Sequence, residues 1–280
     1  MEVKIAENAG FCFGVKRAMQ MALDELENKN DNGVYSLGPL IHNKQAVDKY
    51  KEKGLIEKDV LEKIPNNSKV IIRSHGVAKE VYTNSEYKNL KIVDTTCPFV
   101  TKIHNIVKEF YDKGYKIIIV GNAEHPEIIG INGWCNNEAI VINSYKEIEN
   151  YLFDNNYKYC VVSQTTANLE FFDTLIKKLG SIIENLTVKN TICSATKERQ
   201  LSAIDLAKEV DCMIVIGGKH SSNTQKLVSI CEDIVPTFSI ETKEDLNKEN
   251  LQGYKVAGVT AGASTPDWII REVIEVLKEI

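Results

Sequence analysis

Residues 116–127 read KIIIVGNAEHPE, an apolar run of Ile and Val that gives way at Gly121 to a short polar loop. Five other stretches share this plan: VYSLGPLIHN (34–43), KVIIRSHGV (69–77), YCVVSQTT (159–166), DCMIVIGGKHSSN (211–223) and YKVAGVTAGAST (254–265). Runs rich in β-branched residues predict buried strands, and most of the loops lead into a helical pattern. This alternation predicts an α/β fold built on parallel sheets.

The composition is that of a globular protein without a general affinity for nucleic acid. The chain has 280 residues, of which 43% are hydrophobic and 26% charged, and its formal net charge is -5. No basic block stands out, so nucleic acid is not an expected partner. The longest apolar runs are too short to cross a bilayer, and the first ten residues lack the pattern of a signal peptide. We therefore expect a cytoplasmic protein without a membrane partner.

Three cysteines indicate a threefold organisation. Cys12, Cys97 and Cys193 each come just before a stretch with helical spacing, and Pro98 suits the first turn of the second helix. Two strand-plus-loop segments lie between successive cysteines, and a third pair follows Cys193. The pattern predicts three similar α/β units of about 90 residues, a length at the small end for domains. Their expected bounds are 1–96, 97–192 and 193–280, the last with a C-terminal helix.

The seven cysteines fall into two groups. An odd count in a chain of this type argues against a disulfide framework. Four cysteines are expected to be buried and structural: Cys135, Cys160, Cys212 and Cys231. The other three precede helices, where free N–H groups and the helix dipole favour the thiolate. Three converging thiolates would leave one metal position open, but burial and nucleophilic catalysis also remain open from the residues alone.

Polar side chains follow the predicted strands at the point where each strand ends. They are His42, His75, His125, Thr165, Thr166, His220, Ser221, Ser222, Asn223 and Ser264. The carboxyl ends of parallel strands gather ligands, and this donor-rich set suits phosphate or diphosphate oxygens. Glu127 is the carboxylate in these loops that is best placed to relay protons, and the alternative is an ordinary surface pair with His125. His104 lies within a predicted helix, where we expect a packed or half-exposed side chain.

Nine motifs in order identify a resemblance that covers essentially the whole chain. They are AGFCFGVKRA, GPLIHN, RSHGV, VDTTCPFV, GNAEHPE, SQTT, ICSATKERQ, GGKHSSNT and VTAGASTP. With them the sequence resembles the family of 4-hydroxy-3-methylbut-2-enyl diphosphate reductases, iron–sulfur enzymes of the non-mevalonate pathway of isoprene biosynthesis. The resemblance implies three α/β units arranged around a central cluster and substrate cavity.

The resemblance also implies the roles of particular residues. Cys12, Cys97 and Cys193 would ligate a 4Fe–4S cluster whose fourth iron is open to the substrate's hydroxyl oxygen. Seven residues would hold the diphosphate: His42, His75, His125, Ser221, Ser222, Asn223 and Ser264. Thr165 and Glu127 would lie near the hydroxymethyl group, with Glu127 supplying protons and His125 also part of the catalytic set, while Thr166 is a weaker assignment.

The reaction implied is a two-electron reductive dehydroxylation of the allylic diphosphate to isopentenyl and dimethylallyl diphosphate. The chain has no flavin or nicotinamide motif, so the electrons would come from a ferredoxin or a flavodoxin. Two other functions compete with this one. A zinc-dependent hydrolase of a phosphorylated small molecule could use the loop histidines and Glu127. The protein could also bind a diphosphate without catalysis, but this function does not explain why Cys12, Cys97 and Cys193 all precede helices.

Overall fold

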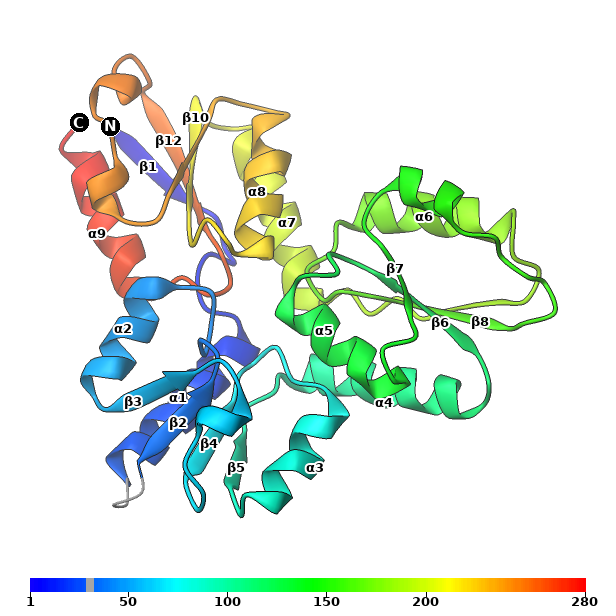
Figure 1. Ribbon diagram of the computed structural model, residues 1–280. Coiled ribbons are helices and arrows are strands. Elements are labelled where there is room, and N and C mark those ends of the chain that lie inside the picture. Colours follow the sequence, from blue (N-terminus) through cyan, green and yellow to red (C-terminus); the bar gives the residue numbers. More distant parts are fainter. Residues whose placement is uncertain (29–32) are drawn as a thin grey trace. The chain divides into compact units, whose positions relative to one another are not determined.

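The structure is a computed structural model that describes residues 1–28 and 33–280. The chain divides into two compact units. Unit 1 comprises Met1–Lys16, Ile41–Tyr50 and Ser194–Ile280, and unit 2 comprises Arg17–Leu40 and Lys51–Cys193. Figure 1 labels most of the helices and strands of both units. None of the helices in the described part is long and apolar enough to cross a membrane.

Within the described residues three four-stranded parallel sheets form the framework, which confirms the predicted α/β class. Unit 1 holds sheet A, in the order β1 (Glu2–Ile5), β12 (Val256–Ala261), β10 (Cys212–Ile216) and β11 (Thr237–Ile240). Unit 2 holds sheet B, in the order β3 (Leu55–Lys58), β2 (Val34–Leu37), β4 (Lys69–Ile72) and β5 (Lys91–Asp94). It also holds sheet C, in the order β7 (Ile140–Ile142), β6 (Lys116–Val120), β8 (Tyr159–Ser163) and β9 (Leu186–Val188).

The three sheets repeat one topology. In sheets B and C the chain lays down a strand, adds a second at one edge, crosses back to place a third beside the first, and adds a fourth at the other edge. Sheet A has the same order, but its fourth position is taken by β1, which pairs with β12 from Glu2 opposite Val256. The beginning of the chain thus completes the sheet formed by its end. The division at residues 96 and 192 stays a prediction.

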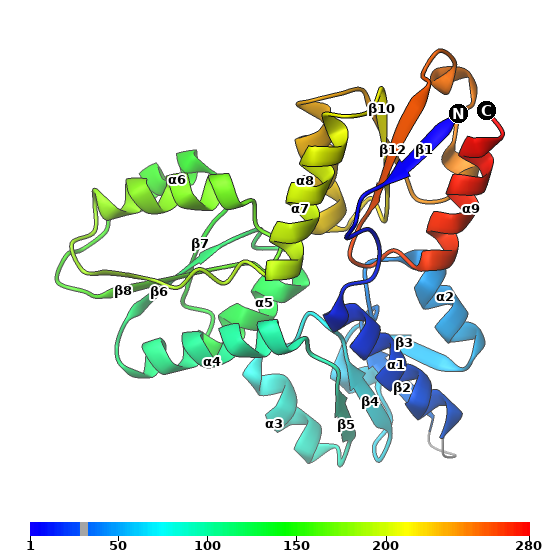
Figure 2. The same cartoon turned by 180° about the vertical axis from the view of Figure 1, so that it is seen from behind.

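Helices cover both faces of sheet A. Helices α7 (Ser194–Ala207) and α8 (Ser222–Glu232) lie on one face and α9 (Asp267–Lys278) on the other (Figures 1 and 2). Side chains of β10 alternate between them, since Cys212, Ile214 and Ile216 share a core with α9, whereas Met213 and Val215 share one with α7 and α8. A strand buried on both faces has to be apolar throughout, which explains its unbroken apolar sequence.

Sheet C is covered in the same way. Ile117 and Ile119 pack toward α4 (Pro98–Asp112) and α5 (Pro126–Asn132), while Ile118 and Val120 pack toward α6 (Leu169–Gly180). Sheet B packs one face against α3 (Lys79–Tyr87), and Figure 2 shows α1 (Phe13–Glu27) over β2 and β4 on its other side. The remaining helices are α2 (Lys44–Glu52) and the short 3-10 turns η1 (Leu61–Lys63), η2 (Gly133–Cys135), η3 (Tyr145–Asn150), η4 (Lys243–Asp245) and η5 (Glu249–Leu251).

The helices that follow Cys12 and Cys97 have the expected apolar faces. In α1 the residues Val15, Ala18, Met19, Ala22 and Leu26 are buried, as their spacing predicts. Helix α4 begins at Pro98 and ends before Gly114, whose φ of +81° is a conformation that glycine adopts without strain.

The predicted apolar face of α7 is correct only in part, since Ala207 is buried and Val210, just past the helix, packs against the same core. The sequence favours a stripe through Leu201, Ile204, Ala207 and Val210, but Leu201 is 48% exposed and the helix ends at Ala207. In its first half the buried residues are polar instead and include Arg199, whose Nη2 donates a 2.7 Å hydrogen bond to the carbonyl of Gly10. A buried polar group is tolerated when it is hydrogen-bonded, so the side chain pattern alone misplaced this face.

Candidate functional site

The three cysteines at helix starts occupy equivalent local positions. Each is half-buried, follows the fourth strand of its sheet, and donates its backbone N–H to the loop after the third strand. The bonds are Cys12 N–H to Ala263 O (3.3 Å), Cys97 N–H to Ser74 O (3.0 Å) and Cys193 N–H to Thr165 O (3.0 Å). Because the three sheets share one topology, each has a cysteine at the same position, after its fourth strand and beside the loop that follows its third strand.

The other four cysteines are buried, as the sequence predicts. Burial raises the pKa of the Cys135, Cys212 and Cys231 thiols to about 11 and that of Cys160 to about 12. Such thiols are almost entirely protonated at neutral pH, which suits structural cysteines and not metal ligands. The sequence favours an irregular stretch at Cys135, but this residue ends the 3-10 turn η2 (Gly133–Cys135). No disulfide joins the described cysteines.

Glu127 and Thr165 form a buried hydrogen-bonded pair in unit 2. Glu127 lies in the first turn of α5, and Thr165 lies in the loop after β8. The backbone N–H of Thr165 donates to Oε1 of Glu127 (2.6 Å), and its hydroxyl donates to Oε2 (2.7 Å). Both carboxylate oxygens are therefore oriented by one residue.

Burial changes the acidity of this carboxyl group. Glu127 is only 3% exposed, and loss of solvent raises its pKa to about 7, although the two bonds from Thr165 act in the opposite direction. A carboxyl group with a pKa near the working pH can both hold and release a proton. Its neighbour Glu124 is exposed. The pair thus has the properties of an acid–base group held in one orientation.

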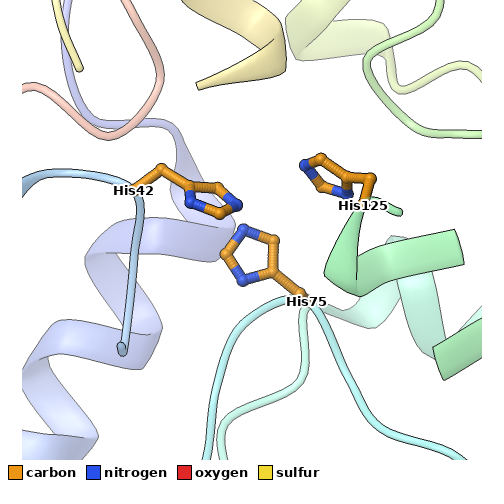
Figure 3. A group of neighbouring side chains, drawn as sticks. All are labelled: His42, His75 and His125. Atoms are coloured by element: carbon orange, nitrogen blue, oxygen red, sulfur yellow. The ribbon is translucent and has the colours of Figure 1, made fainter. Parts of the chain in front are cut away.

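Two of the predicted histidines lie together in unit 2. His75 comes from the loop after β4 and His125 from the start of α5, and their rings meet edge-on with centroids 5.6 Å apart (Figure 3). The Nδ1 atom of His125 accepts the backbone N–H of Glu127 (3.1 Å), so the neutral ring carries its proton on Nε2. His42, drawn in the same view, belongs to unit 1.

Unit 1 brings together the other predicted polar residues. The hydroxyl of Ser264 donates to the carbonyl of His42 (3.1 Å), and Gly218 lies so close to this carbonyl that a Cβ would be 2.7 Å from it. Ser221 caps α8 by accepting the N–H of Thr224, and the buried Asn223 follows in its first turn. Among the described residues neither polar atom of the Asn223 amide has a hydrogen-bond partner. Buried amides need partners, so this one is suited to a polar ligand.

The remaining predicted residues differ in exposure. Ser222 and Thr166 are half-buried, whereas His220 is exposed and is less suited to a buried site. His104 is buried and packed, as expected.

Two buried polar residues of these loops, Asn43 and Gln164, were not predicted as site residues from the sequence. Asn43 caps α2 by accepting the N–H of Ala46 (2.8 Å), and Gln164 precedes Thr165; both are 3% exposed. Within the described ranges the amide nitrogen of each lacks a hydrogen-bond partner. Both stand inside two of the nine motifs, GPLIHN and SQTT, and this position was the available signal.

Together these observations define a class of protein: an α/β protein of three parallel sheets, with a thiol after the last strand of each topological repeat and a buried acid–base carboxyl group. Residues 3–278 match the LytB protein family. The chain therefore belongs to the LytB family.

Proteins similar to this chain share one name. The chain is 61% identical to the 4-hydroxy-3-methylbut-2-enyl diphosphate reductase of Clostridioides difficile, with full coverage of both, and 50% identical to that of Caldanaerobacter subterraneus subsp. tengcongensis, with 100% and 98% coverage.

Two solved structures that are similar to this chain are also of reductases acting on such a diphosphate. One of (E)-4-hydroxy-3-methyl-but-2-enyl diphosphate reductase, described as the terminal enzyme of the non-mevalonate pathway, shares 42% identity and a TM-score of 0.72, with full coverage of both chains. One of the E-1-hydroxy-2-methyl-but-2-enyl-4-diphosphate reductase from Plasmodium falciparum shares 26% identity and a TM-score of 0.94, over 99% of this chain and 88% of that one. Of the three functions considered from the sequence, these relatives favour the reductase.

Proposed function

We propose that this protein is an oxidoreductase that converts 4-hydroxy-3-methylbut-2-enyl diphosphate to isopentenyl and dimethylallyl diphosphate. The observation that carries the proposal is the full-length similarity to reductases of that name, in a chain whose buried acid–base pair suits proton delivery. The C–O bond of the allylic alcohol breaks, two electrons and two protons are taken up, and water leaves. One proton goes to the departing oxygen and the other to an end carbon of the allyl group, which gives the two products.

The chemistry of the donor set fits a 4Fe–4S cluster held by Cys12, Cys97 and Cys193. These three thiols are half-buried and stand at helix starts, whereas the other four cysteines are buried, and burial raises the pKa of their thiols. When bound, such a cluster supplies electrons one at a time and, at the iron without a cysteine, a Lewis acid for the departing hydroxyl group.

The residues around the diphosphate are proposed from the same resemblance. The resemblance assigns this role to His75 and His125 of unit 2, and to five residues of unit 1: His42, Ser221, Ser222, Asn223 and Ser264. The unsatisfied amide of Asn223 and the N-terminus of α8 support the part of this set in unit 1, since N–H groups and hydroxyls suit phosphate oxygens.

Replacement of Asn223 by alanine is expected to raise KM by about 10- to 100-fold with a smaller change in kcat, because a hydrogen bond to a charged group contributes about 1.5–3 kcal/mol. Gln225→Ala is the matched control, because Gln225 lies on the same helix, is exposed and bonds the carbonyl of Lys219. Steady-state kinetics with the allylic diphosphate measure both. Equal KM values for the two variants and the unaltered protein would remove Asn223 from the binding set.

Glu127 is proposed as the proton donor to the departing hydroxyl oxygen, with Thr165 holding its carboxyl group in place. Its pKa of about 7 makes the protonated form abundant at neutral pH. An ordinary glutamate, with a pKa near 4.3, would be almost entirely ionised there. The raised pKa is thus what allows a carboxyl group to act as an acid under cellular conditions.

The rate should therefore depend on pH in one direction. Because the acid form is the donor and the pKa of Glu127 is about 7, kcat should be nearly constant below that pH and fall toward tenfold per pH unit above it. The measurement is kcat at saturating substrate from about 1.5 pH units below the pKa of Glu127 to about 2 units above it. A kcat that stays constant or rises across pH 7 would contradict this role.

The electron donor and the location are further parts of the proposal. A ferredoxin or a flavodoxin would deliver the two electrons singly, because the sequence has no flavin or nicotinamide motif. A cytoplasmic location would keep the three ligand thiols reduced.

An anaerobic assay tests the function directly. Protein purified without oxygen is mixed with reduced methyl viologen and 4-hydroxy-3-methylbut-2-enyl diphosphate, and the products are separated by chromatography. We expect both five-carbon diphosphates and oxidation of two viologens per substrate consumed, as the electron balance requires. Release of inorganic phosphate without viologen oxidation would instead support the hydrolase.

A further inference from the structure

The loop that carries His75 is packed against the side chain of His104 from α4. Gly76 follows His75 with a φ of +72°, and a Cβ on it would lie 2.5 Å from Cε1 and 3.1 Å from Nε2 of His104. The imidazole ring therefore rests directly on the loop backbone. Any side chain at Gly76 would push the ring and the loop apart.

The same loop is held from a second side by α5 and η2. The backbone of Gly130 approaches Gly76 so closely that a Cβ would be 3.3 Å from its carbonyl carbon and oxygen. One turn further, the indole Nε1 of Trp134 donates a 3.0 Å hydrogen bond to the carbonyl of Val77. Helix α5 begins beside His125 and contains Glu127, so the loop with His75 is fastened to the helix that presents the acid–base group.

His104 and Trp134 contact each other as well as the loop. Their rings stack with centroids 5.1 Å apart and an interplanar angle of 19°. His104 is 2% exposed, burial lowers its pKa to about 4, and its Nε2 has no hydrogen-bond partner among the described residues. The ring is thus neutral at physiological pH, and what it supplies is a flat, compact surface between Gly76 and the indole.

We propose that His104 and Trp134 are positioning residues that fix His75 relative to His125 and Glu127. The stacked pair joins three elements of unit 2, namely α4, the loop after β4, and the segment formed by α5 and η2. Loss of the pair frees the loop and lets the His75 ring leave its edge-on contact with His125. The proposal rests on the proposed function in one respect, which is that His75 and His125 bind the diphosphate.

His104→Ala tests the proposal, with Val107→Ala as the matched control. Val107 lies on the same helix and is fully buried, but it packs into the core of sheet C and not on the loop. We expect His104→Ala to raise the substrate KM and the dissociation constant of inorganic diphosphate at least tenfold, with kcat changed much less. Amide hydrogen exchange in residues 73–78 should become faster. Val107→Ala should lower the melting temperature but leave these constants and the exchange of the loop unchanged.

Trp134→Phe is a milder variant that keeps an aromatic ring against His104 and removes the bond to Val77. We expect a smaller rise in KM and in the diphosphate dissociation constant than in His104→Ala, and this variant decides the matter if His104→Ala does not fold. Unchanged diphosphate binding and loop exchange in the folded variants would overturn the proposal. Diphosphate binding and amide exchange in the loop can be measured without turnover. If the wild-type protein is inactive as a reductase, the proposed function is refuted. These two measurements still test whether His104 and Trp134 position His75.

Discussion

Glu127→Gln is expected to lower kcat by about 100- to 10,000-fold, the contribution typical of a positioned general acid or base. Glutamine has nearly the shape of a protonated glutamate, so it can keep both contacts with Thr165, but it cannot release a proton. Iron content, KM and the circular dichroism spectrum should therefore remain close to those of the unaltered protein. Turnover with reduced methyl viologen, measured beside iron analysis, shows whether only the chemical step is lost.

Stability cannot account for such a loss. The pKa of Glu127 is raised by burial, so the folded protein binds this proton more tightly than the unfolded chain does. Its contribution to stability is present at low pH and is lost as the pH rises from about 4.3 to about 7. Glutamine does not ionise, and at pH 8 the variant should be at least as stable as the unaltered protein.

Glu124→Gln is the matched control for Glu127→Gln, because Glu124 lies three residues earlier and is exposed. It should keep full activity. Near-normal turnover in Glu127→Gln, or an equal loss in both variants, would remove Glu127 from the mechanism.

Cys97→Ala is expected to lose most of the bound iron and acid-labile sulfide, and turnover with it. Cys97 is the residue from which α4 starts, its backbone N–H is bonded to Ser74, and it supplies one of only three proposed ligands. A cluster with two cysteines lacks the coordination that holds its irons. Iron and sulfide analysis and the visible absorption spectrum of anaerobically purified protein give the readout without any assay of activity.

Cys160→Ala provides the comparison, because Cys160 is a fully buried cysteine of the same unit whose thiol has a pKa of about 12. It should lower stability somewhat, as the loss of a small buried side chain does, and keep its iron. A full complement of iron and sulfide in Cys97→Ala would contradict the assignment of the ligand.

The central strands of all three sheets could be predicted from the sequence, but the edge strands could not. Strands such as β6 are buried on both faces, so their residues form long β-branched runs. An edge strand is short and partly exposed, as β3 with the sequence LIEK or β9 with LTV shows. Mixed apolar and charged residues over three or four positions carry little signal. The pairing of β1 with β12 could not be foreseen either, because it joins strands from the two ends of the chain.

The residues proposed for the chemistry were easier to predict than the residues that pack behind them. Side chains at strand ends and helix starts stand out, which is why Glu127 and Thr165 could be named before their bonds were seen. The stack of His104 on Trp134 depends on contacts between distant segments. In the sequence both residues look like ordinary packing residues, because periodicity reports burial and not the partner. The polar buried face of α7 was missed for a related reason, since the partner of Arg199 is Gly10.

The central claim, that three cysteines hold a cluster with one position open to the substrate, is tested most directly by Mössbauer spectroscopy of anaerobically purified, iron-57-enriched protein. Spectra are recorded with and without 4-hydroxy-3-methylbut-2-enyl diphosphate. We predict one iron distinct from the others and a change confined to its signal when the substrate is added. Equivalent irons whose spectrum does not respond to the substrate, or zinc in place of iron and sulfide, would contradict the account.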